Sequence, residues 1–233
     1  HGGSKQAVFA DFDNDGDLDL YVCNWHQRNY VYRNDGNRFV SLTETSVAAG
    51  DTSRSNGVTV GDLDNDGMID IVVTRTGSQN SVYRNLGNWN FVDVSGIVAF
   101  ASGPNSYGSA VADFDTDGDL DLVIANSEGV SYFENTGEFS FLPQLIDGLT
   151  DVIDAGAIAI ADIDGDGDQD MFIGSQSDFV ERLGDYRQRR SACFVNKLDS
   201  RAAITVRLRS RFSNTYAVGG RVILWRQDGS GEP

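Results

Sequence analysis

Short stretches rich in aspartate recur four times in the chain, and their spacing suits the chemistry of cation binding. The first stretch reads Asp-Phe-Asp-Asn-Asp-Gly-Asp-Leu-Asp and spans residues 11–19. In all four stretches, positions 1, 3, 5 and 9 are Asp and position 6 is Gly. Carboxylates crowded so closely would repel one another strongly if no counter-ion were present. A hard cation, which takes about 6–8 oxygen ligands, would remove this repulsion.

The alternate spacing lets side chains 1, 3 and 5 converge on one side of a tight loop, and the Gly allows the positive φ or close approach that the reversal needs. We expect the carbonyl at position 7 to add a backbone ligand, because Met68 replaces Asp there in the second loop. The Asp at position 9 would close the ligand shell. The predicted metal-binding residues are Asp11, Asp13, Asp15, Asp17, Asp19, Asp62, Asp64, Asp66, Met68, Asp70, Asp113, Asp115, Asp117, Asp119, Asp121, Asp162, Asp164, Asp166, Asp168 and Asp170.

The predicted cation is Ca²⁺, with one ion in each loop. An all-protein carboxylate cage suits this larger ion better than Mg²⁺, and the sequence has no convergent His and Cys set for Zn²⁺. An EF-hand is excluded, because its loop needs an acidic residue at position 12. Position 12 is apolar here: Val22, Val73, Ile124 and Ile173. A solvated Asp-Gly turn is the alternative for a single loop, but four copies argue against it.

The four loops belong to an internal repeat. They begin at residues 11, 62, 113 and 162, so the spacing is 51, 51 and 49 residues. Each loop lies between two short apolar segments, and a third segment ends in Asn34, Asn85, Asn135 or Asn196. A Gly and a last aromatic strand follow in the first three copies. No stretch carries a helical period over three turns. A repeat of about 50 residues with four strands is typical of propeller blades.

The predicted fold is therefore all-β: a β-propeller of four-stranded blades, since a single blade cannot bury both of its faces. Blade boundaries are expected at about 1–54, 55–105, 106–155 and 156–200, followed by a C-terminal β segment, 201–233. We favour a larger propeller of which these four repeats are a part. The alternatives are that the four repeats close alone, because propellers have typically about 4–8 blades, or that several chains complete the ring.

Charge supports this division and restricts the partners. Residues 1–180 carry a net −23 and residues 181–233 a net +6, which together give −17. Such an acidic chain would repel nucleic acid and anionic membranes, and no apolar run reaches the ~20 residues of a membrane span. The first residue is His1 rather than Met, so we expect a mature or excised piece.

The loops, together with the Tyr-Arg-Asn-x-Gly-x-x-Phe pattern, resemble FG-GAP/VCBS repeats, the calcium-bearing blades of integrin α-chain propellers and many secreted microbial proteins. The resemblance covers about residues 5–200. Residues 203–222 resemble the opening of an ASPIC/UnbV domain, which follows such blades in proteins similar to cartilage acidic protein. Gly220 stands where that domain is expected to have Ala, and the domain would be truncated at Pro233.

The resemblance implies a non-enzymatic, secreted or cell-surface protein that binds calcium and acts in adhesion, matrix-type interaction or assembly. Its partner would be a protein or a glycan at an extracellular surface, or another copy of the chain. The alternatives are a lectin-like propeller and a structural subunit of an extracellular filament, with a polysaccharide-acting enzyme domain less favoured.

Other residues are more simply explained by structure than by catalysis. Only His26 could serve a Ser-His-Asp triad, and the sequence has no nucleophile motif to accompany it. The aromatic residues Trp25, Trp89 and Tyr107 could stack on sugar rings but more often pack blades. The basic stretch 182–190 is expected to be a solvated loop, with docking on an acidic surface as the alternative. Cys23 and Cys193 are expected to be buried thiols unless their strands meet.

Overall fold

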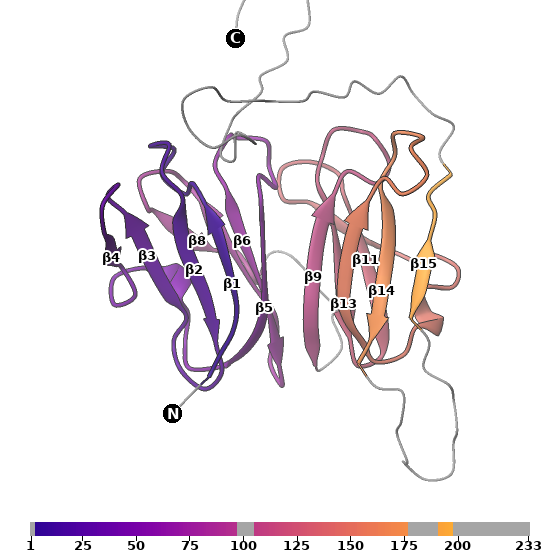
Figure 1. Ribbon diagram of the computed structural model, residues 1–233, viewed down its shortest axis with the longest axis horizontal. Helices are drawn as coiled ribbons and strands as arrows, with labels where there is room; N and C mark the ends of the chain where they lie inside the picture. Colours follow the sequence, from indigo (N-terminus) through magenta and orange to yellow (C-terminus); the bar gives the residue numbers. More distant parts are fainter. Residues whose placement is uncertain (1–2, 97–104, 177–190, 198–233) are drawn as a thin grey trace, which may run out of the picture. The chain divides into compact units, whose positions relative to one another are not determined.

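The predicted all-β class is confirmed. The computed structural model describes residues 3–96, 105–176 and 191–197 of the 233-residue chain. In this part, the regular elements are β-strands and two single-turn 3₁₀ helices, η1 (Val47–Ala49) and η2 (Leu149–Asp151). The strands form four antiparallel sheets, each built from strands consecutive in the sequence (Figure 1). Among these residues, no helix is long and apolar enough to cross a membrane.

Each sheet is one propeller-type blade. Blade 1 consists of β1 (Ser4–Ala10), β2 (Asp19–Asn24), β3 (Tyr30–Asn34) and β4 (Phe39–Ser41). Blade 2 consists of β5 (Arg54–Gly61), β6 (Asp70–Thr76), β7 (Ser81–Asn85) and β8 (Phe91–Asp93). Blade 3 consists of β9 (Ser106–Ala112), β10 (Asp121–Asn126), β11 (Gly129–Asn135) and β12 (Phe141–Gln144). The described strands of blade 4 are β13 (Ala155–Ala161), β14 (Asp170–Ser175) and β15 (Ala192–Phe194).

Neighbouring blades pack face to face, because both faces of an inner blade are apolar. In β6, Ile71 points toward blade 1 and the next residue, Val72, points toward blade 3, as the alternation of a strand requires. Three hydrophobic clusters result, one shared by blades 1 and 2, one by blades 2 and 3, and one by blades 3 and 4. We call the face of a blade that meets the preceding blade its leading face, and the opposite one its trailing face.

The first strands of neighbouring blades approach each other closely. The Thr59 hydroxyl donates to the Ser109 carbonyl at 2.7 Å. A Cβ at Gly57 would lie 2.8 Å from the Tyr107 carbonyl oxygen, and one at Gly108 would lie 3.1 Å from the Gly156 carbonyl oxygen. Because Cβ contacts below 3.0 Å essentially never occur, Gly57 is required by this packing.

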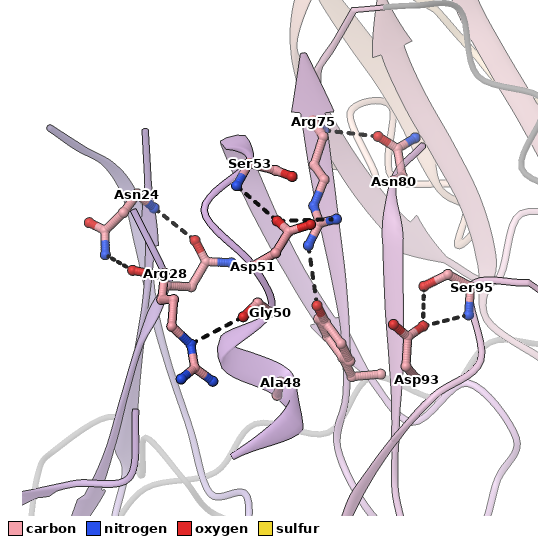
Figure 2. Close-up of polar contacts among 12 residues, drawn as sticks. Asn24, Arg28, Ala48, Gly50, Asp51, Ser53, Arg75, Asn80, Asp93 and Ser95 are labelled. Carbon is pink, nitrogen blue, oxygen red and sulfur yellow. Dashed lines mark hydrogen bonds and ion pairs between the residues drawn. The ribbon is translucent and has the colours of Figure 1, made fainter. Parts of the chain in front are cut away.

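The buried Arg75 helps to fix the connection from blade 1 to blade 2. Arg75 lies beside Asp51 of this connection, and Figure 2 shows the two side chains facing each other, with 3.9 Å between Nη1 and Oδ1. The Arg75 backbone N–H donates to Asn80 Oδ1 at 2.9 Å, and its Nη2 donates to the Tyr83 hydroxyl at 3.2 Å. The guanidinium of Arg75 thus joins β6, β7 and the connecting segment.

The two cysteines do not pair in this structure. Cys23 is buried between blades 1 and 2, and Cys193 is exposed on blade 4, so the expectation of two buried thiols is correct only for Cys23. Burial raises the pKa of Cys23 to about 12.

The chain divides into two compact units, 1–203 and 204–233. The second unit lies outside the described residues, as does the basic stretch 182–190. The predicted blade boundaries and C-terminal β segment therefore stay predictions.

Candidate metal sites in the blade loops

The four aspartate loops occupy the same place in each blade. Loop 1 (residues 11–19), loop 2 (62–70), loop 3 (113–121) and loop 4 (162–170) each join the first strand to the second. The Asp at position 9 is the first residue of the second strand in every blade. Both ends of each loop are therefore held by strand pairing, for example by Ala10 opposite Asp19.

The Asp at position 1 folds the loop around its own carboxylate. In loop 1, Asp11 Oδ1 accepts from the backbone N–H of Asp15 at 3.1 Å, and Oδ2 accepts from that of Gly16 at 3.0 Å. Loops 2 and 3 repeat both bonds with Asp62 and Asp113. In loop 4, Asp162 keeps the bond from the position 6 Gly, Gly167, at 3.2 Å, but its other donor is the N–H of Gly165, at 2.7 Å.

Two positions in each loop have positive φ. Position 6 is Gly, with φ between 87° and 102° in the four loops, as the sequence predicted. Position 4 also lies in the left-handed region, at Asn14, Asn65, Thr116 and Gly165. Asn tolerates this region well among non-glycine residues. The Asn at position 4 of loops 1 and 2 is therefore a second sequence signal for the turn, beside the Gly at position 6.

Three carboxylates converge in each loop. In loops 1 to 3 the oxygens of positions 1, 3 and 5 lie within 4.8 Å of one another, and in loop 4 those of positions 1, 3 and 9 do so. The members are Asp11, Asp13 and Asp15; Asp62, Asp64 and Asp66; Asp113, Asp115 and Asp117; and Asp162, Asp164 and Asp170. The crowding has an electrostatic cost: burial, followed by the charge of Asp66, raises the pKa of Asp64.

The position 9 carboxylate anchors its loop to the sheet. Asp70 is fully buried, and its Oδ2 accepts from the Leu63 N–H at 2.9 Å while Oδ1 accepts from the Asn85 N–H at 2.8 Å. The same two bonds occur at Asp19, Asp121 and Asp170. Burial raises the pKa to about 7 at Asp70 and to about 6 at Asp19 and Asp121.

Position 7 closes the turn through its backbone. The N–H donates to Oδ1 of the Asp at position 5, with distances of 2.9 to 3.2 Å in the four loops. The residues concerned are Asp17, Met68, Asp119 and Asp168, and their acceptors are Asp15, Asp66, Asp117 and Asp166. Ligation through the position 7 carbonyl stays a prediction.

The donor set fits a hard cation. Oδ1 of Asp13 and Oδ1 of Asp64 are buried and have no hydrogen-bond donor among the described residues. A buried carboxylate oxygen without a donor is costly, and a cation in the loop would compensate it. Because each loop offers carboxylate oxygens, Ca²⁺ or a similar ion suits the site better than Zn²⁺.

Loop 2 differs from the others by the guanidinium of Arg84. Arg84 Nη2 forms an ion pair with Asp64 and lies 3.6 Å from Asp66 Oδ2. Arg33 is the matching residue of blade 1, but it pairs with Asp35, at 2.7 Å, rather than with its loop. Blade 2 has Leu86 in place of Asp35, so Arg84 finds its nearest carboxylates in the loop itself.

Loops 1, 2 and 3 are also held by the following blade through an Asn side chain. Asn85 Nδ2 donates to the Phe12 carbonyl of loop 1 at 2.8 Å, and Asn135 Nδ2 donates to the Leu63 carbonyl of loop 2 at 2.9 Å. Asn196 Nδ2 bonds in the same way to the Phe114 carbonyl of loop 3, at 2.8 Å. The recurrence of this Asn marked the repeat in the sequence, but the contact between blades became evident only in the structure.

A second link connects neighbouring loops directly. Asn14 Nδ2 of loop 1 donates to the Gly67 carbonyl of loop 2 at 3.1 Å, and Asn65 of loop 2 reaches Asp119 of loop 3 at 2.5 Å. The indole N–H of Trp89 in blade 2 donates to Asp13 Oδ2 at 2.7 Å. Loops 1 and 2, and loops 2 and 3, are therefore in direct contact.

The aromatic candidates for sugar stacking occupy different environments. Trp89 packs against Phe12 and Phe91, so it is a blade-packing residue. Trp25 is half-buried, with the Lys5 ammonium 4.9 Å and the Arg54 guanidinium 5.6 Å from its ring. Tyr107 is half-buried, and its carbonyl accepts from the Thr74 hydroxyl.

Comparison with solved structures gives partial matches, of which two are described here. A lectin from Agrocybe aegerita, described as recognising non-reducing terminal N-acetylglucosamine, has 20% sequence identity and a TM-score of 0.48, over 81% of this chain and 51% of the lectin. The V. cholerae biofilm matrix protein Bap1 has 23% identity and a TM-score of 0.42, over 72% of this chain and 27% of Bap1. The chain thus spans about half and about a quarter of these two proteins.

The sequence comparisons identify the repeats. A search of curated proteins gives no match to the chain. The FG-GAP-like repeat matches three overlapping segments, residues 11–73, 62–124 and 113–173, each of which begins at the first Asp of a loop and ends in the second strand of the next blade. These matches cover more than half of the chain. With its aspartate loops between paired strands, the chain belongs to the FG-GAP-like repeat family.

Proposed function

We propose that the protein is a non-enzymatic, calcium-stabilised propeller that acts outside the cell in adhesion, matrix-type interaction or assembly. The observation that supports this proposal best is the convergence of three carboxylates in each of four similarly built loops. The buried oxygens of Asp13 and Asp64 that lack a donor among the described residues add to it. In this proposal one Ca²⁺ binds in each loop, with the position 7 carbonyl and the position 9 Asp completing the ligand shell.

Calcium would act mainly on stability. Four Ca²⁺ ions would bring the formal charge of the chain from −17 to about −9 and remove the repulsion within each loop. Because the ions bind the folded loops and not the unfolded chain, their binding free energy adds to the stability of the fold. An affinity of about 10⁻⁴–10⁻³ M, typical of extracellular calcium modules, would keep such loops filled outside the cell and empty inside it.

The experiment that tests this proposal combines metal analysis with melting. We expect about four Ca²⁺ per chain by elemental analysis, and a large fall in the melting temperature after EDTA that Ca²⁺ reverses. The Asp64→Asn variant should lose about one ion, while Glu44→Gln, an exposed acid outside the loops, should lose none. If EDTA leaves melting unchanged and no metal is found, the proposal fails.

The partner is proposed to be a protein or a glycan at an extracellular surface. A glycan array distinguishes these two classes: selective binding would support a lectin-like role, whereas broad silence would favour a protein partner. The array should be run with Ca²⁺ present and with EDTA, because a propeller that works through its loops should bind only in Ca²⁺.

Residues 201–233 are proposed to open an ASPIC/UnbV domain. The support is their sequence alone, including Val218-Gly219-Gly220-Arg221-Val222, because these residues lie outside the described part of the chain. Limited proteolysis tests the domain boundary: a first cut between residues 195 and 205 is expected, and a first cut within a blade would contradict it.

A further inference from the structure

Four side chains form a basic and aromatic cluster where blade 1 meets blade 2. Trp25 follows β2 directly, and it pairs with Arg54, the first residue of β5, in an isolated β-bridge. The Lys5 ammonium lies 4.9 Å and the Arg54 guanidinium 5.6 Å from the centroid of the Trp25 ring. The His26 ring meets that of Trp25 edge to face at 5.7 Å, and its Nε2 accepts from Arg54 Nε at 3.2 Å. We call Lys5, Trp25, His26 and Arg54 the junction cluster.

The backbone of the blades holds the junction cluster in place. The first strand of every blade contains a β-bulge, which leaves one residue unpaired: Lys5, Asn56, Tyr107 and Gly156. A bulge re-aims the side chain that it carries, and in blade 1 this side chain is the one that reaches Trp25. Lys5 and Arg54 stand near the start of strands that end at loops 1 and 2. The cluster therefore lies at the opposite end of the blades from the metal loops.

The fold does not require these four side chains, because the other junctions replace them. At the junction of blades 2 and 3, 51 positions further on, the equivalents are Asn56, Thr76, Gly77 and Asn105. The bridge between Thr76 and Asn105 recurs there, and Asn56 Nδ2 donates to the Thr76 hydroxyl at 2.7 Å and to the Ser106 carbonyl at 2.6 Å. At the junction of blades 3 and 4 the equivalents are Tyr107, Ser127, Glu128 and Asp154. The same backbone thus carries a basic, a neutral and an acidic set.

The backbone of His26 indicates that this set has a role beyond packing. Its φ is 60°, in the left-handed region, where blade 2 has Gly77 with φ of 73°. Glycine adopts this conformation without strain, whereas a side chain such as that of His carries a cost. Residues that keep such strain are concentrated at binding and active sites. A histidine at this turn is therefore better explained by what it holds, the Arg54 guanidinium, than by the turn itself.

The two cations of the cluster are not neutralised by the rest of the described chain. Lys5 and Arg54 are exposed, and neither forms an ion pair with another described residue. Residues 1–180 carry a net −23 and only seven basic side chains. Two unpaired cations next to one indole therefore form a local positive site on an acidic protein, which suits an anionic group of a ligand.

The acids near the cluster restrict the kind of anion. Asp51, three residues before Arg54, already faces Arg75 (Figure 2), and Glu44 pairs with Arg28. A ligand with an acid on every unit would be repelled by these carboxylates and by the net charge of the blades. An acid group between neutral, hydroxyl-rich units would meet chiefly the two free cations. The half-buried indole of Trp25 offers apolar surface for the carbon face of a sugar ring beside them.

We infer that the junction cluster binds an acidic sugar that is flanked by neutral sugars. The carboxylate or sulfate group of this sugar lies between the Lys5 ammonium and the Arg54 guanidinium, whose planar fork suits an anion with two free oxygens. His26 orients the guanidinium through Nε, and Trp25 keeps both cations close together. The inference rests on the glycan part of the proposed function, for which it names the class of glycan, and it does not involve the metal loops.

Calorimetric titration with three hexasaccharides tests the ligand class at a fixed Ca²⁺ concentration. The probes are a hyaluronan fragment, in which carboxylated and neutral sugars alternate, a keratan sulfate fragment, which has sulfate but no carboxylate, and the neutral chitohexaose. At least one acidic probe should bind tenfold more tightly than chitohexaose, and the probe that binds identifies the acid group. Raising the salt concentration should weaken this binding, because the cations are exposed.

Substitutions with a matched control test the location. Lys5→Gln and Arg54→Gln should each weaken binding of the acidic probe at least fivefold without changing the melting temperature, because both side chains are exposed. The control is Arg38→Gln, since Arg38 is 73% exposed and pairs with Asp35; it should bind like the wild type. The acidic probe should also change the tryptophan fluorescence, and Trp25→Phe should abolish this change.

Four results would overturn the inference. They are no binding of either acidic probe, equally tight binding of chitohexaose, an equal loss in Arg38→Gln, and tighter binding of hexaglutamate, which would make the ligand an acidic peptide. If the acidic probes fail while a glycan array detects another sugar, this site is refuted and the proposed function stands. If EDTA leaves melting unchanged and no metal is found, the calcium proposal fails, whereas the titrations still decide the junction cluster.

Discussion

Replacing Asn85 by Ala should destabilise the protein more than the same change at Asn34, although the two residues hold equivalent places in blades 2 and 1. Asn85 is fully buried, and its Nδ2 donates to the Phe12 carbonyl at 2.8 Å and to the Ile69 carbonyl at 3.1 Å. Its Oδ1 accepts from the Gly87 N–H at 3.0 Å. Among the described residues, the Asn34 side chain bonds within its own blade, and it is half-buried.

The magnitude follows from these contacts. A hydrogen bond contributes about 1 kcal/mol net, and a buried group left without its partner costs about 1–3 kcal/mol. Asn85→Ala removes three bonds at a fully buried site, so we expect a loss of about 3–5 kcal/mol in the free energy of unfolding. Asn34→Ala should lose about 1–2 kcal/mol. At about 2–4 °C per kcal/mol for a chain of this size, the Asn85 variant should melt about 6–20 °C lower than the wild type.

Urea unfolding at a fixed Ca²⁺ concentration measures both losses. Asn85→Asp is the matched variant, because it keeps the size of the side chain but replaces the donor by an acceptor. It should cost at least as much as Asn85→Ala, since it places an oxygen against two carbonyls. If Asn85→Ala and Asn34→Ala differ by less than about 0.5 kcal/mol, the bond between the blades does not stabilise the fold as we argue.

The remaining predictions concern the loops. Arg84→Gln should tighten Ca²⁺ binding at loop 2 about tenfold in calorimetric titrations, because a unit charge ~6 Å from a divalent ion costs about 1.4 kcal/mol even with water-like screening. Arg33→Gln should change loop 1 little, and equal effects of the two variants would refute this role. Trp89 fluorescence should shift when Ca²⁺ displaces its bond to Asp13, and Trp89→Phe should abolish the shift; its persistence would locate the signal elsewhere. In EDTA, burial raises the pKa of Asp70 from 3.8 to about 7, so the folded protein holds this proton more tightly than the unfolded chain does. Stability of the metal-free protein should then fall as the pH rises from about 4 to about 7, and urea titrations that show a rise would contradict the assignment.

The repeat and its strands were predictable because the pattern is local. Alternation along a strand and a Gly that permits positive φ are properties of a few neighbouring residues, and the repetition of the loop fixes the blade. The carboxylates of positions 1, 3 and 5 are close in sequence, so their convergence also follows from the loop alone. In loop 4, however, Asp170 rather than Asp166 joins the other two, which reflects a loop with Gly at two positions.

The links between blades could not be predicted, because they join residues far apart in sequence. Asn85 and Phe12 are 73 positions apart, and Trp89 and Asp13 are 76 positions apart. The Asn was visible as a repeated letter, but its amide could equally have served its own turn. The ion pair of Arg84 could not be predicted either. Its partner depends on the residue two positions after the arginine, which is the charged Asp35 in blade 1 and the apolar Leu86 in blade 2.

The links also indicate how the proposed calcium ions would affect folding. The Asn85 backbone N–H donates to Asp70 of loop 2, and its side-chain Nδ2 donates to the Phe12 carbonyl of loop 1. A single residue is therefore hydrogen-bonded to two loops. An ion that ordered one loop would therefore stabilise the blade that carries the next, and the four proposed sites should not melt independently.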